Sequence, residues 1–225
     1  MACPEAQIPR NVRGVAMIEL ESMDVFQTYI YKVKRPDFLP ALKGISAKYF
    51  SPSANPACGS EVYPVTQTGS FFNEPEAKDF CDFIYESSMS ILDHQGYAMG
   101  SHSLSFQDLW FQEHRVGSGH DRHVHSGSAI SGFYFMNGMP NSSVAVFYDP
   151  RPAKEYGVNL PLKDVSRLTS GSNAMNIVPE AGMFVFANSW MHHAFTRNES
   201  SEPLVFVHFD LAAVPADPQN GVIII

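Results

Sequence analysis

Positively charged residues are scarce in this sequence, which has 15 lysines and arginines against 23 aspartates and glutamates and a formal net charge of -8. Proteins that bind nucleic acid usually present a basic patch, because contacts with the phosphate backbone dominate their affinity. The sequence has no such cluster of lysine and arginine, so we do not expect nucleic acid as the main partner. A small anion held by one or two arginines stays open.

Cysteine is also rare, and Cys3, Cys58 and Cys81 are widely spaced. Their odd number and the lack of a Cys-x-x-Cys pair argue against a disulfide framework and against a structural zinc site. No apolar run is long enough to span a membrane, and Val222–Ile225 is too short to anchor in one. The first residues lack the charged start and apolar run of a signal peptide. We therefore expect a cytoplasmic protein without a membrane partner.

The 225 residues, 44% of them hydrophobic, are enough for one well-packed domain. A short helix is expected from Pro36 to Lys43, ended by Gly44, and residues 51–72 are expected to form a long loop. A longer helix should begin at an Asn73 N-cap and end at Gly96. From Leu104 onward, alternating apolar residues predict strands at residues 104–112, 129–136, 144–148, 174–178, 183–188, 191–197 and 204–211. This pattern favours a sandwich or barrel of antiparallel strands.

His123 and His125 stand two apart at the start of an aromatic-rich strand, so their side chains should lie on one face and could share a metal ion. A third ligand could come from His192 or His193, which point to opposite faces. Imidazole suits iron, zinc, copper and nickel, so histidines alone leave the metal open. His208 and Asp210 have the spacing of a metal-binding pair, but no histidine follows them, and we expect no role in the metal site.

Several segments in a fixed order then resemble the 2-oxoglutarate/Fe(II)-dependent oxygenases, and more closely a group of them common in marine microbes and phages. The resemblance covers about residues 25–30 and 110–211. The matching segments are Phe26–Tyr31, Trp110–Gln112, His123–His125, Ile130–Phe135, Tyr148–Pro150, Ala181–Phe186, Ser189–Phe195 and Phe209–Leu211. Each segment alone would be weak, but their order and spacing are specific.

The resemblance implies a mainly β fold, a double-stranded β-helix (jelly-roll) with flanking helices. Together with the length of the chain, this leads us to expect a single domain over 1–225, with residues 1–100 or so as strand and helix support and about 101–215 as the jelly-roll core. The resemblance also implies an Fe(II)/2-oxoglutarate-dependent dioxygenase, which couples decarboxylation of 2-oxoglutarate to oxidation, expected to be hydroxylation, of a second substrate. By position, the ligands would be His123, His125 and His193. Trp110, Ser131 and Tyr134 are expected to line the pocket for cofactor and substrate.

Two departures from that family stand out. His125 occupies a position where the broader superfamily has a carboxylate ligand, and Leu204 occupies the usual position of an arginine that holds the far carboxylate of 2-oxoglutarate. Arg197 shares strand parity with His193, and a symmetric hairpin would pair it with Leu204. We therefore expect Arg197 to bind the cosubstrate in place of the missing arginine.

Two other functions remain open at this point. A cupin-like three-histidine metalloenzyme would not use 2-oxoglutarate, although cupins usually supply a glutamate shortly after His-x-His, and 126–131 contains none. A non-catalytic jelly-roll would bind a ligand without turnover. The substrate, a small molecule or a peptide, would be recognised by the loops at 51–72 and 150–172, whose composition does not name it.

Overall fold

The computed structural model describes residues 21–51, 57–58, 65–157 and 160–216, so Cys3 and Val222–Ile225 lie outside the described residues. The strands are β1 (Ile30–Lys34), β2 (Ala57–Cys58), β3 (Val65–Gln67), β4 (His102–His114), β5 (His120–His123), β6 (Ile130–Phe135), β7 (Ala145–Tyr148), β8 (Ala174–Ile177), β9 (Met183–Asn188), β10 (His193–Phe195) and β11 (Leu204–Pro215). The helices are α1 (Leu39–Tyr49) and α2 (Lys78–His94), with 3-10 turns at Pro36–Phe38, Pro75–Ala77, Met99–Ser101 and Pro152–Tyr156.

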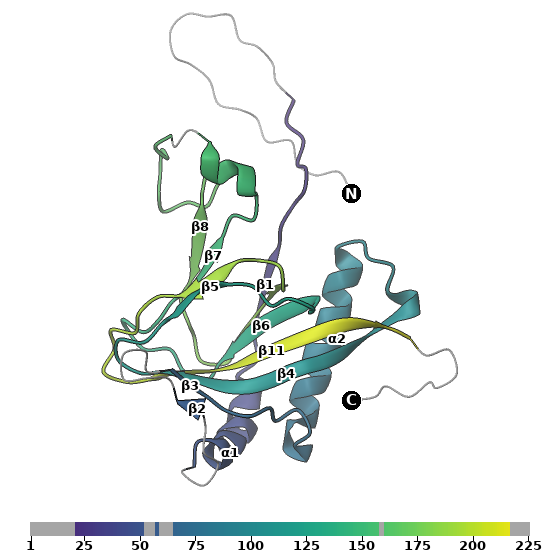
Figure 1. Ribbon diagram of the computed structural model, residues 1–225, viewed down its shortest axis with the longest axis vertical. Coiled ribbons are helices and arrows are strands. Elements are labelled where there is room, and N and C mark those ends of the chain that lie inside the picture. Colours follow the sequence, from purple (N-terminus) through teal and green to yellow (C-terminus); the bar gives the residue numbers. More distant parts are fainter. Residues whose placement is uncertain (1–20, 52–56, 59–64, 158–159, 217–225) are drawn as a thin grey trace, which may run out of the picture.

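The described strands form two antiparallel sheets. The larger has seven strands in the order β1-β9-β6-β11-β4-β3-β2, and the smaller has four in the order β5-β10-β7-β8. Neighbours such as β6 and β11 are far apart in the chain, as expected for a jelly-roll rather than a simple meander. The prediction of a mainly β jelly-roll with flanking helices is confirmed, and Figure 1 shows α2 running along the large sheet.

Strand alternation divides the large sheet into an outer and an inner face. On β11, Val207 and Phe209 belong to an outer core that includes residues of α1 and α2. Leu204 and Phe206 belong to an inner core shared with β7, β8 and β10 of the small sheet. The space between the two sheets is therefore the place where inward side chains of both sheets meet.

The first helix differs from its prediction, because α1 continues through Gly44 to Tyr49 instead of ending there. A glycine inside a helix costs about 1 kcal/mol relative to alanine. Leu42 and Ile45, on either side of Gly44, are each only 1% exposed. Burial of this pair against the large sheet outweighs the local preference of glycine for a helix end.

Residues 51–72 also differ from the prediction of a long loop. They contain β2 and β3, and β3 pairs with the end of β4, where Val65 lies opposite His114. Val65 and Thr66 are buried in this pairing. No local pattern marks so short a strand, because its stability comes from a partner almost 50 residues further along the chain.

The longer helix is confirmed, although its first turn is a 3-10 turn at Pro75–Ala77 and Asn73 is not its cap. Gly96 follows the helix with a φ of 89°, the left-handed conformation expected of a glycine stop. Cys81 is a buried, free thiol on this helix. No helix among the described residues is both long and apolar enough to cross a membrane.

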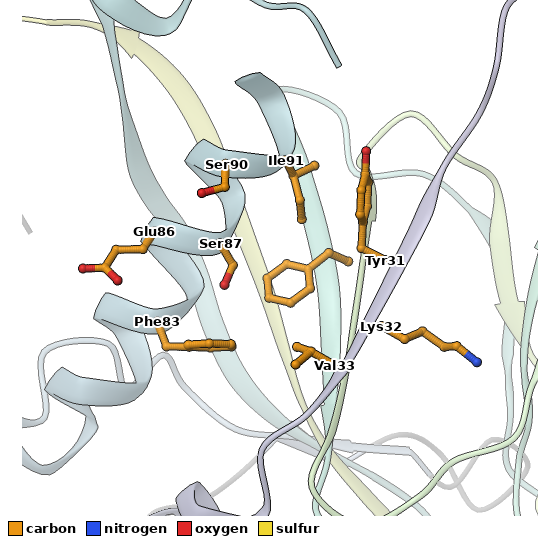
Figure 2. A pocket seen from close by; sticks show the side chains of 9 residues that line it. Tyr31, Lys32, Val33, Phe83, Glu86, Ser87, Ser90 and Ile91 are labelled. Atoms are coloured by element: carbon orange, nitrogen blue, oxygen red, sulfur yellow. The ribbon is translucent and has the colours of Figure 1, made fainter. Parts of the chain in front are cut away.

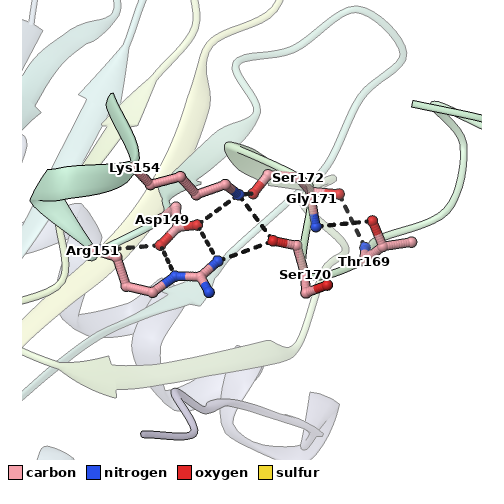
Figure 3. Close-up of polar contacts among 7 residues, drawn as sticks. All are labelled: Asp149, Arg151, Lys154, Thr169, Ser170, Gly171 and Ser172. Atoms are coloured by element: carbon pink, nitrogen blue, oxygen red, sulfur yellow. Dashed lines mark hydrogen bonds and ion pairs between the residues drawn. The ribbon is translucent and has the colours of Figure 1, made fainter. Parts of the chain in front are cut away.

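The polar excursion between β7 and β8 is held at its base by Asp149, as Figure 3 shows. Its carboxylate accepts hydrogen bonds from Arg151 Nη2 at 2.6 Å and from Lys154 Nζ at 2.8 Å. Both cations also donate to the carbonyl oxygen of Ser170 on the returning chain. The hydrogen bond from Arg151 is the main reason that the pKa of Asp149 lies well below its usual range.

We expect Asp149→Ala to loosen this excursion and to make cleavage by trypsin after Lys154 about tenfold faster, because charge-assisted hydrogen bonds that close the base are lost. Limited proteolysis followed by mass spectrometry measures the rate. Asp164→Ala removes an exposed carboxylate from the same excursion and serves as the control. Equal cleavage rates in the two variants would contradict the role of Asp149.

Gly132 on β6 is expected to tolerate no side chain. A Cβ at this position would overlap the ring of Phe209 and the carbonyl oxygen of Val185. We expect Gly132→Ala to lower the free energy of unfolding by about 1–3 kcal/mol, measured by urea denaturation. Gly44→Ala, where a Cβ meets nothing within 4 Å, should instead raise it by up to about 1 kcal/mol.

Candidate metal centre

The pairing of β5 with β10 brings two histidines together. His123 lies directly opposite His193 in this antiparallel pair, and their ring centroids are 4.4 Å apart. Although β5 ends at His123, His125 keeps the same side of the chain, and its backbone N–H donates to the carbonyl oxygen of Ser189 at 3.0 Å. One nitrogen from each of His123, His125 and His193 lies within 4.8 Å of the others.

Hydrogen bonds at Nδ1 orient these three rings. His123 Nδ1 lies 2.6 Å from the carbonyl oxygen of Asp121, and His193 Nδ1 lies 3.0 Å from that of Met191. Since a carbonyl oxygen only accepts, Nδ1 carries the proton in both rings and Nε2 keeps its lone pair. His125 Nδ1 lies 2.8 Å from the carboxylate Oδ2 of Asp210.

The Nε2 atoms of His125 and His193 are buried without a hydrogen-bond partner in the described part of the chain. Burial is the main cause that lowers the pKa of His193 to about 3 and also lowers that of His123. Burial therefore favours neutral imidazoles at His193 and His123, the form that binds a metal ion. Unpaired, converging lone pairs held by second-sphere hydrogen bonds fit a divalent transition metal.

The large sheet faces this triad with polar and aromatic side chains. His208 on β11 is almost fully buried and stacks on Trp110 of β4, with ring centroids 4.3 Å apart. The ring centroids of His208 and His125 are 4.4 Å apart. One side-chain nitrogen or oxygen from each of His125, His208 and Asp210 also lies within 4.8 Å of the other two. The expectation that the pair at 208 and 210 has no part in the site therefore needs correction, because strand parity turns both residues inward.

The comparisons with known proteins agree with this architecture. Residues 108–210 match the model of the family described as "Putative 2OG-Fe(II) oxygenase", a range that contains all the histidines above. The chain belongs to the 2OG-Fe(II) oxygenases. It is thus an enzyme that depends on Fe(II) and 2-oxoglutarate. No curated protein matches the chain in sequence.

Solved structures with low sequence identity share the fold of this oxygenase. A Pseudomonas putida prolyl-4-hydroxylase is 12% identical with a TM-score of 0.58, over 82% of this chain and 92% of its own. A viral collagen prolyl hydroxylase from Paramecium Bursaria Chlorella virus-1 is 11% identical with a TM-score of 0.53, over 81% and 95%. HygX from Streptomyces hygroscopicus, solved with nickel and 2-oxoglutarate bound, is 8% identical with a TM-score of 0.51, over 82% and 83%.

The remaining residues expected in the pocket of this oxygenase lie in different places. Trp110 contacts the site through His208, and Ser131 is buried on the inner face opposite Asp210. Tyr134 instead points to the outer face, where its hydroxyl donates to the carbonyl oxygen of Arg35 at 2.8 Å. The expectation that Tyr134 lines the pocket is therefore wrong, because it has the opposite strand parity to Ser131.

The proposed pairing of Arg197 with Leu204 is also wrong. β10 belongs to the small sheet and β11 to the large one, so residues 198–203 cross between sheets instead of forming a hairpin. Arg197 is exposed, whereas Leu204 is fully buried opposite His114. This oxygenase therefore has no guanidinium paired with Leu204 among the residues that the structure describes.

A row of neutral polar side chains, which the sequence did not reveal, leads from the triad toward Leu204. The ring of His120 is 4.2 Å from that of His123. Gln112 Nε2 lies 3.4 Å from His120 Nδ1 and 2.8 Å from His114 Nε2. Burial lowers the pKa of His120 to about 4 and that of His114 to about 3. The alternation of side chains along β4 turns Trp110, Gln112 and His114 inward, and this sequence signal could have predicted the polar row.

A separate cavity of about 370 Å³ lies between α2 and β1, shown in Figure 2. Its floor is apolar, with Val33, Phe83 and Ile91, and Glu86 lies at its rim. None of the histidines of the triad lines it, since it is on the helix side of the large sheet. It is therefore not the metal centre of this oxygenase.

The buried His114 should make the fold sensitive to acid. Its pKa of about 3 is below the ordinary 6.5, so the unfolded chain binds a proton that the native chain does not, and stability falls as the pH drops below about 6.5. Between pH 7 and pH 5, His114→Gln should lose about 2 kcal/mol less than the unmodified protein.

Urea denaturation with EDTA at both pH values measures this difference. His102→Gln, which changes an exposed histidine on the same strand, is the control and should behave like the unmodified protein. The same pH dependence in His114→Gln as in the control would show that His114 is not the source of the acid sensitivity.

Proposed function

We propose that His123, His125 and His193 hold Fe(II) through their Nε2 atoms, and that the enzyme hydroxylates a small-molecule or peptide substrate. The observation that carries the ligand set is the unpaired, buried Nε2 atoms of His125 and His193, each ring being held by a hydrogen bond at Nδ1. When bound, Fe(II) supplies activation of dioxygen, coupled to decarboxylation of 2-oxoglutarate.

The chain's own residues would prepare this chemistry. The carbonyl oxygens of Asp121 and Met191 accept the Nδ1 protons and keep both rings in one orientation. Phe133 and Phe147 pack against His193, with ring centroids 5.3 and 5.7 Å away, and keep water from its buried side. Half-buried His123 marks the side of the triad open to cosubstrate and substrate.

The far carboxylate of 2-oxoglutarate would then meet neutral donors instead of an arginine. His120, Gln112 and His114 lie on the inner face, beginning next to His123. Neutral donors bind a carboxylate less strongly than a bidentate guanidinium does. These neutral donors support the use of 2-oxoglutarate, with only a modest contribution of its far carboxylate to the binding affinity. We also propose a cytoplasmic location, supported by the free thiol of Cys81 and testable by cell fractionation.

His193→Ala should abolish Fe(II) binding, because it removes the ligand that β10 contributes. Anaerobic addition of Fe(II) and then 2-oxoglutarate should give the unmodified protein a visible charge-transfer band that His193→Ala lacks. His192→Ala, which changes the exposed adjacent residue, should keep the band.

Titration with pyruvate, which lacks the far carboxylate, shows in the same experiment how much that group contributes. If Fe(II) binds but neither 2-oxoglutarate nor pyruvate produces the charge-transfer band, the result would favour the three-histidine metalloenzyme that does not use 2-oxoglutarate. Failure of the unmodified protein to bind Fe(II) would overturn the proposed ligand set.

A further inference from the structure

Asp210 is an unusual residue for the inner face of a jelly-roll. It lies on β11, 6% exposed, opposite Ser131 of β6 and Asp108 of β4. Its Oδ2 contacts His125 Nδ1 at 2.8 Å, and its Oδ1 has no hydrogen-bond partner among the described residues. A buried carboxylate is costly unless a positive charge or several donors compensate it.

The described surroundings of Asp210 supply little compensation. Its ion-pair contacts are His125 at 2.8 Å and His208 Nδ1 at 4.0 Å. His208 is almost fully buried, and neither of its ring nitrogens has a hydrogen-bond partner among the described residues. Asp108 adds a second acidic group, whose Oδ1 accepts from the backbone N–H of Leu109 at 2.8 Å. Among the described residues, the carboxylate of Asp210 therefore has no ion-pair partner other than these two histidines.

The triad lacks the charge that Asp210 carries. Three neutral imidazoles leave a divalent ion with a net charge of +2 in a buried site, whereas a carboxylate ligand would reduce it to +1. Asp210 is separated from the proposed ligand atom, Nε2, only by the imidazole ring of His125. A carboxylate bonded to the far nitrogen of a metal-binding histidine fixes the orientation of the ring and raises its basicity.

We propose that Asp210 is a positioning residue that supplies, through the ring of His125, the negative charge that the three-histidine triad lacks. The inference rests on the proposed ligand set and deepens it. In this proposal Asp210 acts through the contact of its Oδ2 with His125 Nδ1 and is not itself a ligand. Occupation of the triad is what compensates the buried carboxylate, so metal affinity and Asp210 are coupled.

The test is anaerobic titration of the metal-free full-length protein with Co(II), followed by calorimetry and by the visible d–d bands of Co(II). Asp210→Asn keeps an acceptor oxygen for His125 Nδ1 but removes the charge, and should weaken Co(II) binding about tenfold. Asp210→Ala also frees the ring of His125, and should weaken it up to about 100-fold and shift the d–d bands.

Glu199→Gln is the control, because it removes an exposed carboxylate from the segment that follows β10. It should bind Co(II) within about twofold of the unmodified protein, as expected for a charge screened by water. Thermal unfolding of each metal-free variant separates this effect from a structural one. A purely structural Asp210 would lower the melting temperature without changing Co(II) affinity.

Co(II) binding by Asp210→Asn within twofold of the unmodified protein would overturn the proposal. So would binding of two Co(II) ions per chain with one lost in Asp210→Ala, since Asp210 would then be a ligand together with His125 and His208. The proposed ligand set fails in a different way, namely if the unmodified protein binds no Co(II) or if His193→Ala binds it as tightly.

Discussion

The antiparallel pairing of β5 with β10 places His123 directly opposite His193, and the rest of the site depends on that contact. Two histidines facing each other on a small sheet would be solvated unless a second layer covered them. The inner core, with Phe133 and Phe206 of the large sheet, provides this layer. Once water is removed, each imidazole needs a partner at one nitrogen, and the Nδ1 hydrogen bonds meet this need while Nε2 stays free.

The same covering layer gives the site its electrostatic character. Burial keeps His114, His120, His193 and His208 neutral, so the interior contains many donors and acceptors but few charges. Against this background Asp210 stands out, because its charge is buried beside the triad. A metal ion would be the natural counter-charge, which links the stability of the interior to occupation of the site.

Residue type and spacing in the sequence determined much of the metal centre and of the strand pattern. The His-x-His spacing brought His123 and His125 to one side, the family motif selected His193 over His192, and alternating apolar residues gave nearly all of the strands from residue 102 onward. These features are local or depend on motif order. Strand parity could also have turned His208 and Asp210 inward, but the argument from the missing third histidine in that segment set them aside.

Only the tertiary structure decided which sheet each strand joins. Arg197 was expected to compensate for Leu204, but β10 and β11 lie in different sheets, so the two residues do not pair. Tyr134 faces the helices, and β3 exists only because β4 is there to pair with it. The partner of His125 comes from a strand 85 residues later, at Asp210. Sequence alone fixes which face of a strand a side chain takes, whereas the layer opposite that face results from long-range pairing and burial.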